Sequence, residues 1–294
     1  MGAIVDEALQ GLLARLTPAE VESEAAKRHR TSIEECLTAA FGMEQFFQSG
    51  SFGNGTSIRR HSDVDRFAVL PSAKVHLDSR VTLARVASAL HRRFPNTRVR
   101  INGPGVRCPF GAFGWETTEV IPAVAATSES QQAGFPIYLI ANGTGAWRFA
   151  CPSAHNDLVR GVDARHGGRL KPLIRLLKAW RYFNATPIGS FYLEMAATWH
   201  ADRCEQIAVP FDIMRILEAL FAGQLPDLND PLRVCAPFKA LDTPSNRLSA
   251  LGKLQRGLNL ARRAVDVQLS GHTVRALGSW DVFFAGHLKV RGAS

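Results

Sequence analysis

Two aspartates at the start of an apolar segment are the residues in this sequence best placed to do chemistry. Asp63 and Asp65 stand two positions apart, and the apolar run that follows ends at Leu70. In an extended strand, side chains two residues apart project from the same face, so both carboxylates would lie on one rigid edge. Carboxylate oxygens are ligands that Mg²⁺ uses in proteins. The spacing therefore indicates a divalent-metal site.

A segment rich in Gly, Ser and Thr precedes the pair. It begins with Gly50 and Ser51 and continues through Thr56. Flexible backbone, N–H groups and hydroxyls suit the oxygens of a triphosphate. The two features together indicate nucleotidyl transfer. An isolated Asp-x-Asp pair is, however, more often turn chemistry, and two-metal nucleotidyl transfer needs a third carboxylate.

Glu119 is the best candidate for that third carboxylate. It stands in the apolar segment 117–125, where an unpaired carboxylate would be costly to bury. The alternative is an exposed strand residue paired with Arg98 or Arg100. Glu116 is the nearest competitor, and three positions along a regular strand it points to the opposite face. Only one of the two glutamates can therefore meet the aspartates.

Composition narrows the class of protein. With 294 residues, 46% hydrophobic and 21% charged, the chain is long enough for one large or two moderate domains. A formal net charge of +9 favours polyanionic partners, without distinguishing nucleotides from nucleic acid. No apolar stretch approaches the roughly 18 to 20 residues of a membrane span, and the N-terminus has no basic leader before an apolar core. We therefore expect a cytoplasmic protein with no membrane partner.

The cysteines are scattered and odd in number, so neither a disulfide framework nor a zinc knuckle fits. His155 follows Cys151, and His200 precedes Cys204, closely enough to share a metal. A four-ligand site needs more than one such near pair. The favoured interpretation is therefore that the cysteines are small buried hydrophobes.

Apolar periodicity predicts two regions of different character. Strands are expected at 63–70, 98–107 and 117–125, and helices at 4–16, 18–41 and 78–93. Beyond residue 150 the pattern is helical, with helices expected at 155–165, 168–183, 189–202, 207–222 and 245–269. The fold class is therefore α+β. Residues 1–150 are expected to form a core of strands with N-terminal helices, and residues 151–294 a mainly helical lobe.

The motifs resemble one family. Gly50-Ser51, Thr56 and Asp63-Val64-Asp65 match the signature of polymerase-beta-like nucleotidyltransferases. Glu119-Val-Ile-Pro-Ala123 matches the place where the CD-NTase family has its third acidic residue before a Val/Ile-Pro-Ala run. CD-NTases are the bacterial relatives of cyclic GMP-AMP synthase and oligoadenylate synthetase. The motif around Asp63 is shared by the whole superfamily, whereas the match at Glu119 points to this family in particular.

Further segments extend the resemblance over nearly the whole length, among them the approach to Phe47, the helix Leu176-Leu-Lys-Ala-Trp-Arg181 and the closing segment from Trp280. In such proteins the Lys of that helix and a Ser at the start of the next helix contact donor phosphates, which implies these roles for Lys178 and Ser190. A helix N-terminus attracts phosphate. The residues alone leave simpler alternatives open: Ser190 as a helix cap, and Lys178 on a solvated face.

Arg66 departs from the apolar residue usual at this position in the family. Because successive strand residues point to opposite faces, Arg66 is expected to face away from Asp65. We interpret it as part of a surface or interlobe ion pair.

The resemblance implies a polymerase-beta-like nucleotidyltransferase core, a mixed sheet with flanking helices, packed on a C-terminal helical lobe with the active site in the cleft between them. It implies two Mg²⁺ ions, with Mn²⁺ as a substitute. The implied catalytic and metal-binding residues are Asp63, Asp65 and Glu119, and the implied nucleotide-binding residues are Gly50, Ser51, Lys178 and Ser190.

The function implied by the resemblance is synthesis of a cyclic di- or trinucleotide from NTPs with release of pyrophosphate. The product would activate a downstream effector in antiphage CBASS signalling, with accessory CBASS proteins as further partners. One alternative is a nucleotidyltransferase with an RNA or protein acceptor. A third hypothesis is a non-catalytic nucleotide or RNA sensor, which would gain support if Glu119 pointed away from the aspartates.

Overall fold

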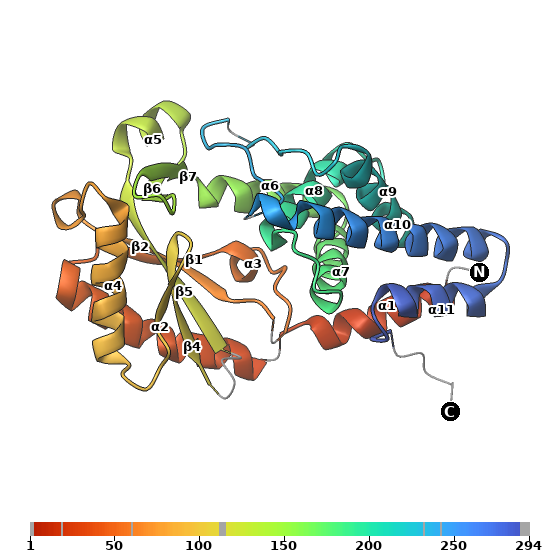
Figure 1. Ribbon diagram of the computed structural model, residues 1–294, viewed down its shortest axis with the longest axis horizontal. Helices are drawn as coiled ribbons and strands as arrows, with labels where there is room; N and C mark the ends of the chain where they lie inside the picture. Colours follow the sequence, from red (N-terminus) through yellow and green to blue (C-terminus); the bar gives the residue numbers. More distant parts are fainter. Residues whose placement is uncertain are drawn as a thin grey trace. The chain divides into compact units, whose positions relative to one another are not determined.

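The computed structural model describes residues 3–18, 20–59, 61–111, 116–231, 233–241 and 243–288 (Figure 1). The chain divides into two compact units. The sheet unit comprises residues 18–158 and 229–236, and the helical unit comprises residues 1–17, 159–228 and 237–294. This division differs from the expected one in three places. The sheet unit continues to residue 158 rather than ending at 150. The first helix belongs with the later helices, and a short loop from the second half of the chain belongs with the sheet.

The sheet unit is built on a mixed sheet of seven strands within the described residues. The strands are β1 (Gln45–Ser49), β2 (Val64–Val69), β3 (Arg100–Asn102), β4 (Gly105–Phe110), β5 (Glu116–Ala125), β6 (Tyr138–Ala141) and β7 (Trp147–Ala150). Their order is β1-β2-β5-β4-β3, with β6 paired to β5 and β7 to β6. β2 runs parallel to β5, and the other pairs are antiparallel. The central strand is therefore β5, which carries Glu119.

One predicted strand proves to be a hairpin. The segment expected as a single strand over 98–107 turns at Gly103, which has a φ of +55° and so suits a tight hairpin turn. The strands β1, β6 and β7 were not predicted. Each is four or five residues long, too short for alternation of apolar residues to distinguish it from a loop.

Helices cover one face of this sheet. α2 (Glu20–Phe41) and α4 (Ser79–Arg93) bury a shared core against β4 and β5. Leu83, Val86 and Leu90 recur at helical spacing on α4 and are all buried. Asp78 caps α4 by accepting a hydrogen bond from the Arg80 backbone N–H at 2.9 Å. This side of the sheet is thus filled by packing.

The other face of the sheet carries a smaller apolar cluster and the connecting helices. Phe67, Val69, Ala123, Tyr138 and Ile140 form that cluster. The short helices α3 (Gly50–Gly53) and α5 (Thr127–Ala133) belong to the sheet unit, and α6 (Pro152–Arg165) begins in it. The N-terminal ends of β2 and β5 on this face are polar, and there the candidate site lies.

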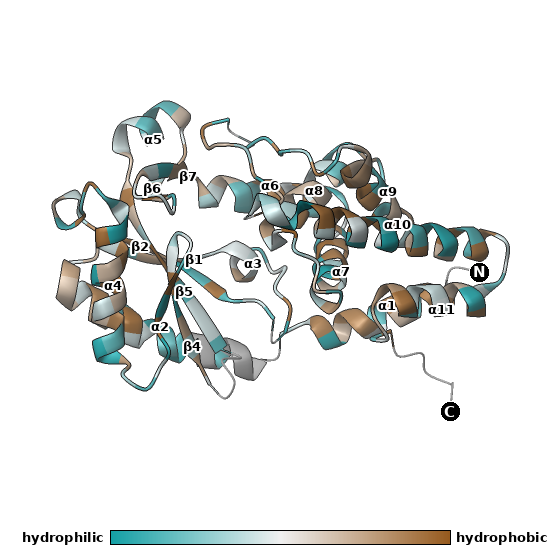
Figure 2. Cartoon of the chain, in the orientation of Figure 1, coloured by the Kyte–Doolittle hydropathy of each residue, from teal (hydrophilic) through white to brown (hydrophobic). Residues whose placement is uncertain are grey.

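The helical unit consists of α1 (Ala3–Leu16), the rest of α6, α7 (Leu170–Phe183), α8 (Ser190–Asp202), α9 (Val209–Ala222), α10 (Arg247–Leu269) and α11 (Thr273–Phe283). α1 packs on α7 and α11, and Figure 2 shows α1 largely in hydrophobic colours. Trp180 is buried against Phe283, as expected of a core aromatic. A Cβ at Gly257 would stand 2.7 Å from Trp180 Nε1, so glycine lets α10 approach α7 closely.

No helix in the described part of the chain combines the length and apolar character that a membrane span requires.

Candidate active site

Asp65 and Glu119 are direct neighbours in the sheet. They are register partners on the parallel strands β2 and β5. Residues in register project from the same face. Two and four positions further along β2 and β5, this face carries the apolar cluster that includes Phe67, Val69 and Ala123. The two carboxylates therefore stand side by side at the N-terminal ends of adjacent strands.

Arg107 connects Asp63 to the same face. Arg107 is the register partner of Glu119 on the other side of β5. Its Nη2 donates to Asp63 Oδ1 at 2.8 Å and lies 2.7 Å from Oδ2. The side chains of Arg107 and Asp63 are 26% and 27% exposed, so a ligand in solution can reach them. The structure thus brings all three predicted carboxylates to one face of the sheet.

Burial and like charge act together on Glu119. Burial raises the pKa of its carboxyl group, a hydrogen bond from Asn102 Nδ2 at 3.1 Å opposes that shift, and the charge of Asp63 raises the pKa further. Arg107 lowers it in part. Glu119 accepts its hydrogen bond from Asn102 rather than from Arg98 or Arg100. A cation bound between these carboxylates would therefore reduce their mutual repulsion.

Glu116 lies on the opposite face. Its Oε2 is 3.7 Å from Nδ1 of His29 on α2, and the His29 ring stacks on Phe110. The two glutamates are three positions apart, and the regular strand turns them to opposite sides. The structure thus places Glu119, and not Glu116, beside Asp65.

Gly50 lies directly against the Asp65 carboxylate. It opens α3 with a φ of +62°, and a Cβ there would stand 1.8 Å from Asp65 Oδ2. Only glycine permits this approach, which brings the backbone of the Gly50-Ser51 segment to the aspartate. The turn is held because the Ser51 carbonyl accepts the Thr56 N–H at 2.8 Å.

Three residues of this site were missed by the sequence reasoning: Asn102, Gly105 and Arg107. A Cβ at Gly105 would stand 2.8 Å from Glu119 Cγ, so this glycine makes room for the glutamate. All three lie in the β3–β4 hairpin, and the register of β4 with β5 puts them beside Glu119. A correct prediction of the hairpin turn at Gly103 would have indicated that these residues lie near Glu119.

The two remaining predicted residues belong to the helical unit. Lys178 on α7 is 2% exposed and forms an ion pair with the buried Glu194 on α8. The alternative that placed Lys178 on a solvated face is therefore wrong. Ser190 is the first residue of α8, as predicted, and the N-cap is Gly189, so Ser190 is not the capping residue.

The expectation of a surface or interlobe pair for Arg66 is also wrong. Arg66 faces away from Asp65, as strand alternation requires, but it is only 3% exposed. Its guanidinium lies 5.9 Å from the centroid of the Phe46 ring. Burial and then the nearby Arg30 lower its pKa, against the opposing effect of Glu34, to about 10. Arg66 is a buried cation on the α2 side of the sheet.

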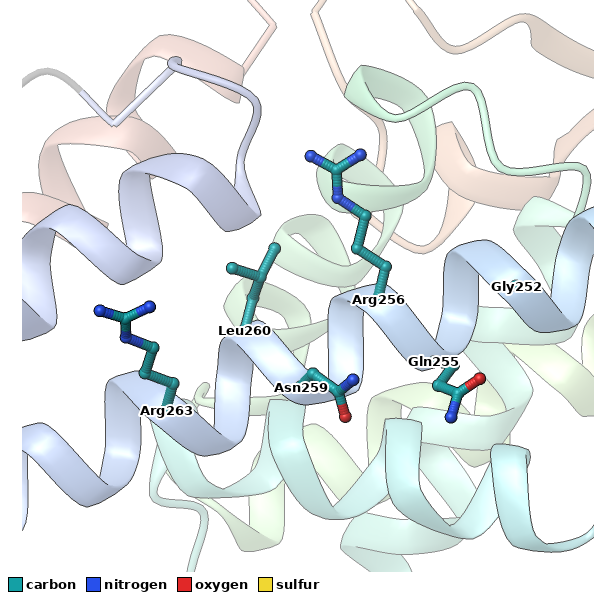
Figure 3. A pocket seen from close by; sticks show the side chains of 6 residues that line it. All are labelled: Gly252, Gln255, Arg256, Asn259, Leu260 and Arg263. Carbon is teal, nitrogen blue, oxygen red and sulfur yellow. The ribbon is translucent and has the colours of Figure 1, made fainter.

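A separate hollow lies along α10 in the helical unit. Figure 3 shows its lining, which includes Arg256, Leu260 and Arg263. Its residues come from one helix and include none of the predicted site residues. We assign it no part in the chemistry.

The carboxylate site fits a divalent metal of the Mg²⁺ type. Its donors are hard carboxylate oxygens, which Mg²⁺ and Mn²⁺ prefer over softer ligands. Burial and then the charge of Asp63 raise the pKa of Glu119, and a bound cation would favour its charged form. Asp63, Asp65 and Glu119 would hold the ion or ions.

Comparison with known structures shows the same fold. V. cholerae DncV, a cyclic AMP-GMP synthase solved with a linear intermediate, aligns with a TM-score of 0.75 and 14% identity, covering 96% of this chain and 94% of that one. E. coli MS115-1 CdnC with ATP aligns with a TM-score of 0.73 and 17% identity, over 96% and 98%. Elizabethkingia meningoseptica CdnE, a cyclic dinucleotide synthase, aligns with a TM-score of 0.63 and 19% identity, over 85% and 97%.

Comparison with curated proteins finds no match. A family model does match: the Second Messenger Oligonucleotide or Dinucleotide Synthetase domain, over residues 4–162. That match covers more than half of the chain and includes Asp63, Asp65 and Glu119. The protein therefore belongs to this family, the CD-NTases, which are nucleotidyltransferases with a polymerase-beta-like fold.

Proposed function

We propose that the protein joins nucleoside triphosphates into a cyclic di- or trinucleotide in a divalent-metal-dependent reaction that releases pyrophosphate. The observation that carries the proposal is the alignment of Asp65 with Glu119 on adjacent parallel strands, with Asp63 drawn to the same face by Arg107. Binding of a nucleotide alone would not require three crowded carboxylates. This arrangement weighs against the non-catalytic sensor.

In each step a ribose hydroxyl oxygen would form a bond to an α-phosphorus, and the bond from that phosphorus to the β-phosphate bridge would break. The electron pair leaves with pyrophosphate. Asp63, Asp65 and Glu119 would hold Mg²⁺, which would lower the pKa of the attacking hydroxyl and neutralise charge on the leaving group. Among the chain's own residues, Glu119, the register partner of Asp65, would accept the hydroxyl proton.

We propose that Gly50 and Ser51 bind the triphosphate. The approach of Gly50 to Asp65 brings backbone N–H groups beside the metal-binding carboxylates. The family resemblance assigns Lys178 and Ser190 to the same triphosphate. Ser190 stands at a helix N-terminus, which supports a phosphate contact, whereas Lys178 already has a carboxylate partner.

Incubation of the protein with Mg²⁺ and all four labelled NTPs, followed by mass spectrometry, tests the proposal. The expected product resists phosphatase and forms without an added acceptor. Asp63→Asn and Asp65→Asn should each lower the rate by at least about 100-fold, because removal of a group that stabilises transition-state charge costs about that much.

Glu116→Gln is the matched control, because it removes a carboxylate from the same strand on the opposite face. It should leave the rate within about twofold of the intact protein. Equal product from the intact protein and both aspartate variants would overturn the proposal. Nucleotide transfer that appears only when RNA or protein is added would favour the alternative acceptor.

We further propose that the product acts in antiphage CBASS signalling through a downstream effector. The family supports this role, and E. coli MS115-1 CdnC, which shares the fold, has been solved in complex with a HORMA protein. In a plaque assay, phage should form fewer plaques on cells that carry the gene with its neighbouring genes. Cells with the Asp63→Asn/Asp65→Asn variant should lose this protection.

A further inference from the structure

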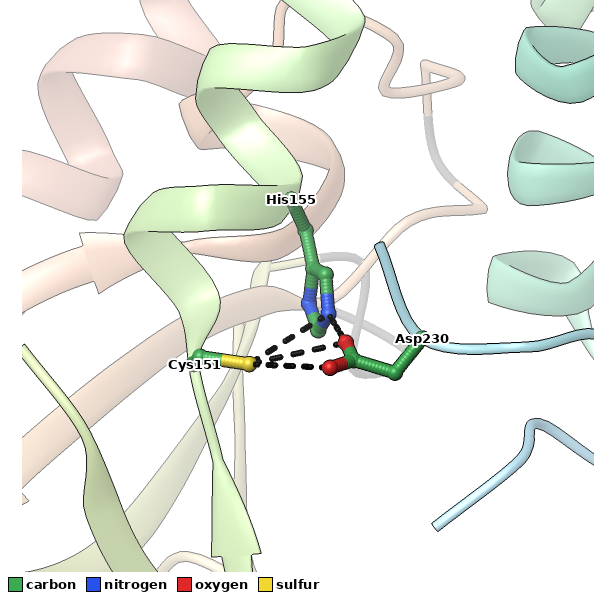
Figure 4. A group of neighbouring side chains, drawn as sticks. All are labelled: Cys151, His155 and Asp230. Atoms are coloured by element: carbon green, nitrogen blue, oxygen red, sulfur yellow. Dashed lines mark hydrogen bonds and ion pairs between the residues drawn. The ribbon is translucent and has the colours of Figure 1, made fainter. Parts of the chain in front are cut away.

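A second group of reactive side chains lies in the sheet unit and includes none of the carboxylates described above. Cys151 follows β7, and His155 stands in the first turn of α6. Asp230 and Cys235 come from the loop 229–236, about eighty positions later in the chain. Figure 4 shows Cys151, His155 and Asp230 directed toward one another.

The donor atoms of Cys151, His155 and Asp230 lie within 4.8 Å of one another, and Cys235 Sγ approaches Cys151. His155 Nε2 lies 2.7 Å from Asp230 Oδ1 and 3.8 Å from Cys151 Sγ. Cys151 Sγ lies 3.5 Å from Asp230 Oδ1 and 3.0 Å from Cys235 Sγ. Cys151, His155 and Asp230 are each at most 9% exposed, so the cluster is closed to solvent on most sides. One sulfur pair, one imidazole and one carboxylate form a set that zinc binds in proteins.

Backbone groups orient the carboxylate toward the cluster. The N–H groups of Val234 and Cys235 donate to Asp230 Oδ2 at 3.0 and 3.2 Å. That oxygen is thereby fixed, and Oδ1 is left facing His155 and Cys151. Burial would raise the pKa of Asp230, but the hydrogen bonds from His155, Cys235 and Val234 outweigh burial and lower it. A metal ligand supported by such outer hydrogen bonds keeps its orientation when the ion binds.

The cluster lies where the loop 229–236 contacts the rest of the sheet unit. The chain before residue 229 and after residue 236 belongs to the helical unit. Val234 and Cys235 pack against buried Ala126, Ile137 and Ala154 of the sheet unit.

We propose that Cys151, His155, Asp230 and Cys235 form a structural zinc site that fastens the loop 229–236 to the sheet unit. With Zn–S distances of about 2.3 Å and Zn–N distances of about 2.0 Å, two sulfur ligands of a tetrahedral ion stand about 3.7 Å apart. The sulfurs need to separate by less than about 1 Å to reach that spacing. The site has four protein ligands and no open position, which is the structural rather than the catalytic type.

Proton balance is simple at this site. Zinc binds thiolate, carboxylate and neutral imidazole, so binding sends the protons shared among Cys151, Cys235, His155 and Asp230 to solvent. No bond to carbon changes and no electrons are transferred. The proposal does not depend on nucleotide synthesis, and its test reads metal content alone.

The other candidate cluster in the described residues is weaker. His200, Cys204 and Asp212 in the helical unit supply three donors. As at Asp230, Oδ2 of Asp212 accepts a backbone N–H, here that of Ala208 at 2.6 Å at the start of α9. Its other oxygen accepts from His200 Nε2 at 2.8 Å. Each cluster has three mutually close donors, but Cys151 Sγ also has Cys235 Sγ 3.0 Å away as a fourth donor, so we place the zinc there.

The test is metal analysis of the full chain, purified without a histidine tag or chelator, kept reduced, and dialysed against Zn²⁺ and then against metal-free buffer. Cys235→Ser should retain about one zinc per chain less than the intact protein, and so should Asp230→Asn. Exchange with Co²⁺ should give a thiolate charge-transfer absorption that Cys235→Ser weakens. We choose Cys235 because it is half-buried, whereas Cys151 is a fully buried core residue whose replacement would disturb the packing.

Cys36→Ser and Cys204→Ser are the matched controls. Each removes one thiol outside the cluster, and each should keep the zinc content of the intact protein. Equal zinc in intact protein and Cys235→Ser would overturn the proposal, as would an intact protein that retains no zinc after dialysis. A Cys151–Cys235 disulfide found by peptide mapping of the reduced and dialysed protein would also overturn it.

Discussion

Glu119 is a carboxylate whose pKa is raised in the folded protein above its ordinary value of 4.5, first by burial and then by Asp63. A raised folded-state pKa means that folding disfavours the charged carboxylate, which lowers the stability of the folded protein. This loss of stability is absent below the pKa of the unfolded state and complete above the pKa of the folded state. Glu119→Gln should therefore raise the Tm of the metal-free protein at pH 7 to 8 and abolish activity. Thermal melts across pH 4 to 8 should show the gain shrinking toward about pH 4.5.

Glu116→Gln again serves as the control, since it removes the same kind of group from the opposite face of β5. It should reproduce neither the pH-dependent gain nor the loss of activity. A Tm for Glu119→Gln below that of the intact metal-free protein at pH 7 would contradict the sign of this prediction.

The guanidinium of Arg107 forms an ion pair with the Asp63 carboxylate. Because Arg107 Nη2 bonds both oxygens of Asp63, a divalent ion at Asp63 competes with it. Arg107→Gln should strengthen Mn²⁺ or Mg²⁺ binding, by up to about fivefold, since a partly exposed pair contributes about 1 kcal/mol or less. Isothermal titration at low salt measures the change. Arg100→Gln, on the register partner of Arg107 in β3, removes equal charge without touching Asp63 and should change affinity less.

At the scale of elements, the contact between α7 and α8 includes a buried ion pair, Lys178 with Glu194. Removal of one partner leaves the other buried charge without its ion-pair partner, so Lys178→Met and Glu194→Met should each destabilise the protein by about 3–5 kcal/mol. Replacement of both by Met should recover most of that loss, because a hydrophobic pair can substitute for a buried ion pair. Urea denaturation of the four proteins gives the double-mutant cycle.

The same cycle separates the two roles of Lys178. If Lys178 contacts phosphate, the double variant should fold but show a raised KM for NTPs. A double variant with an unchanged KM would leave Lys178 a structural residue only.

At the scale of the whole molecule, α1 is separated in sequence from the unit it stabilises. Leu9, Leu12, Leu13 and Leu16 are buried, and α1 packs on α7 and α11. Deletion of residues 1–17 should destabilise the helical unit, because burial of each leucine contributes about 1.5–3 kcal/mol. Hydrogen exchange should speed up in α7 and α11 and stay unchanged in β2 and β5. Faster exchange in the strands as well would show that the two units unfold together.

The long helices were predictable because their stability comes from a continuous apolar face that repeats every 3.6 residues. The observed α4, α7, α8 and α10 begin within about two residues of their predicted starts. The short strands were not predictable, since β6 and β7 are stabilised by pairing with β5 and with each other. The turn at Gly103 was missed for the same reason, and with it Asn102, Gly105 and Arg107.

The sequence by itself indicated the family, the candidate acidic residues and the longer helices except α11, because motifs and periodicity are local properties of the chain. Only the tertiary structure decided which glutamate stands beside Asp65, since that depends on the register of β2 with β5. It also decided that Lys178 and Arg66 are buried. The zinc site became visible for the same physical reason: two near ligands lie in one segment, and folding brings the other two to them from the loop 229–236.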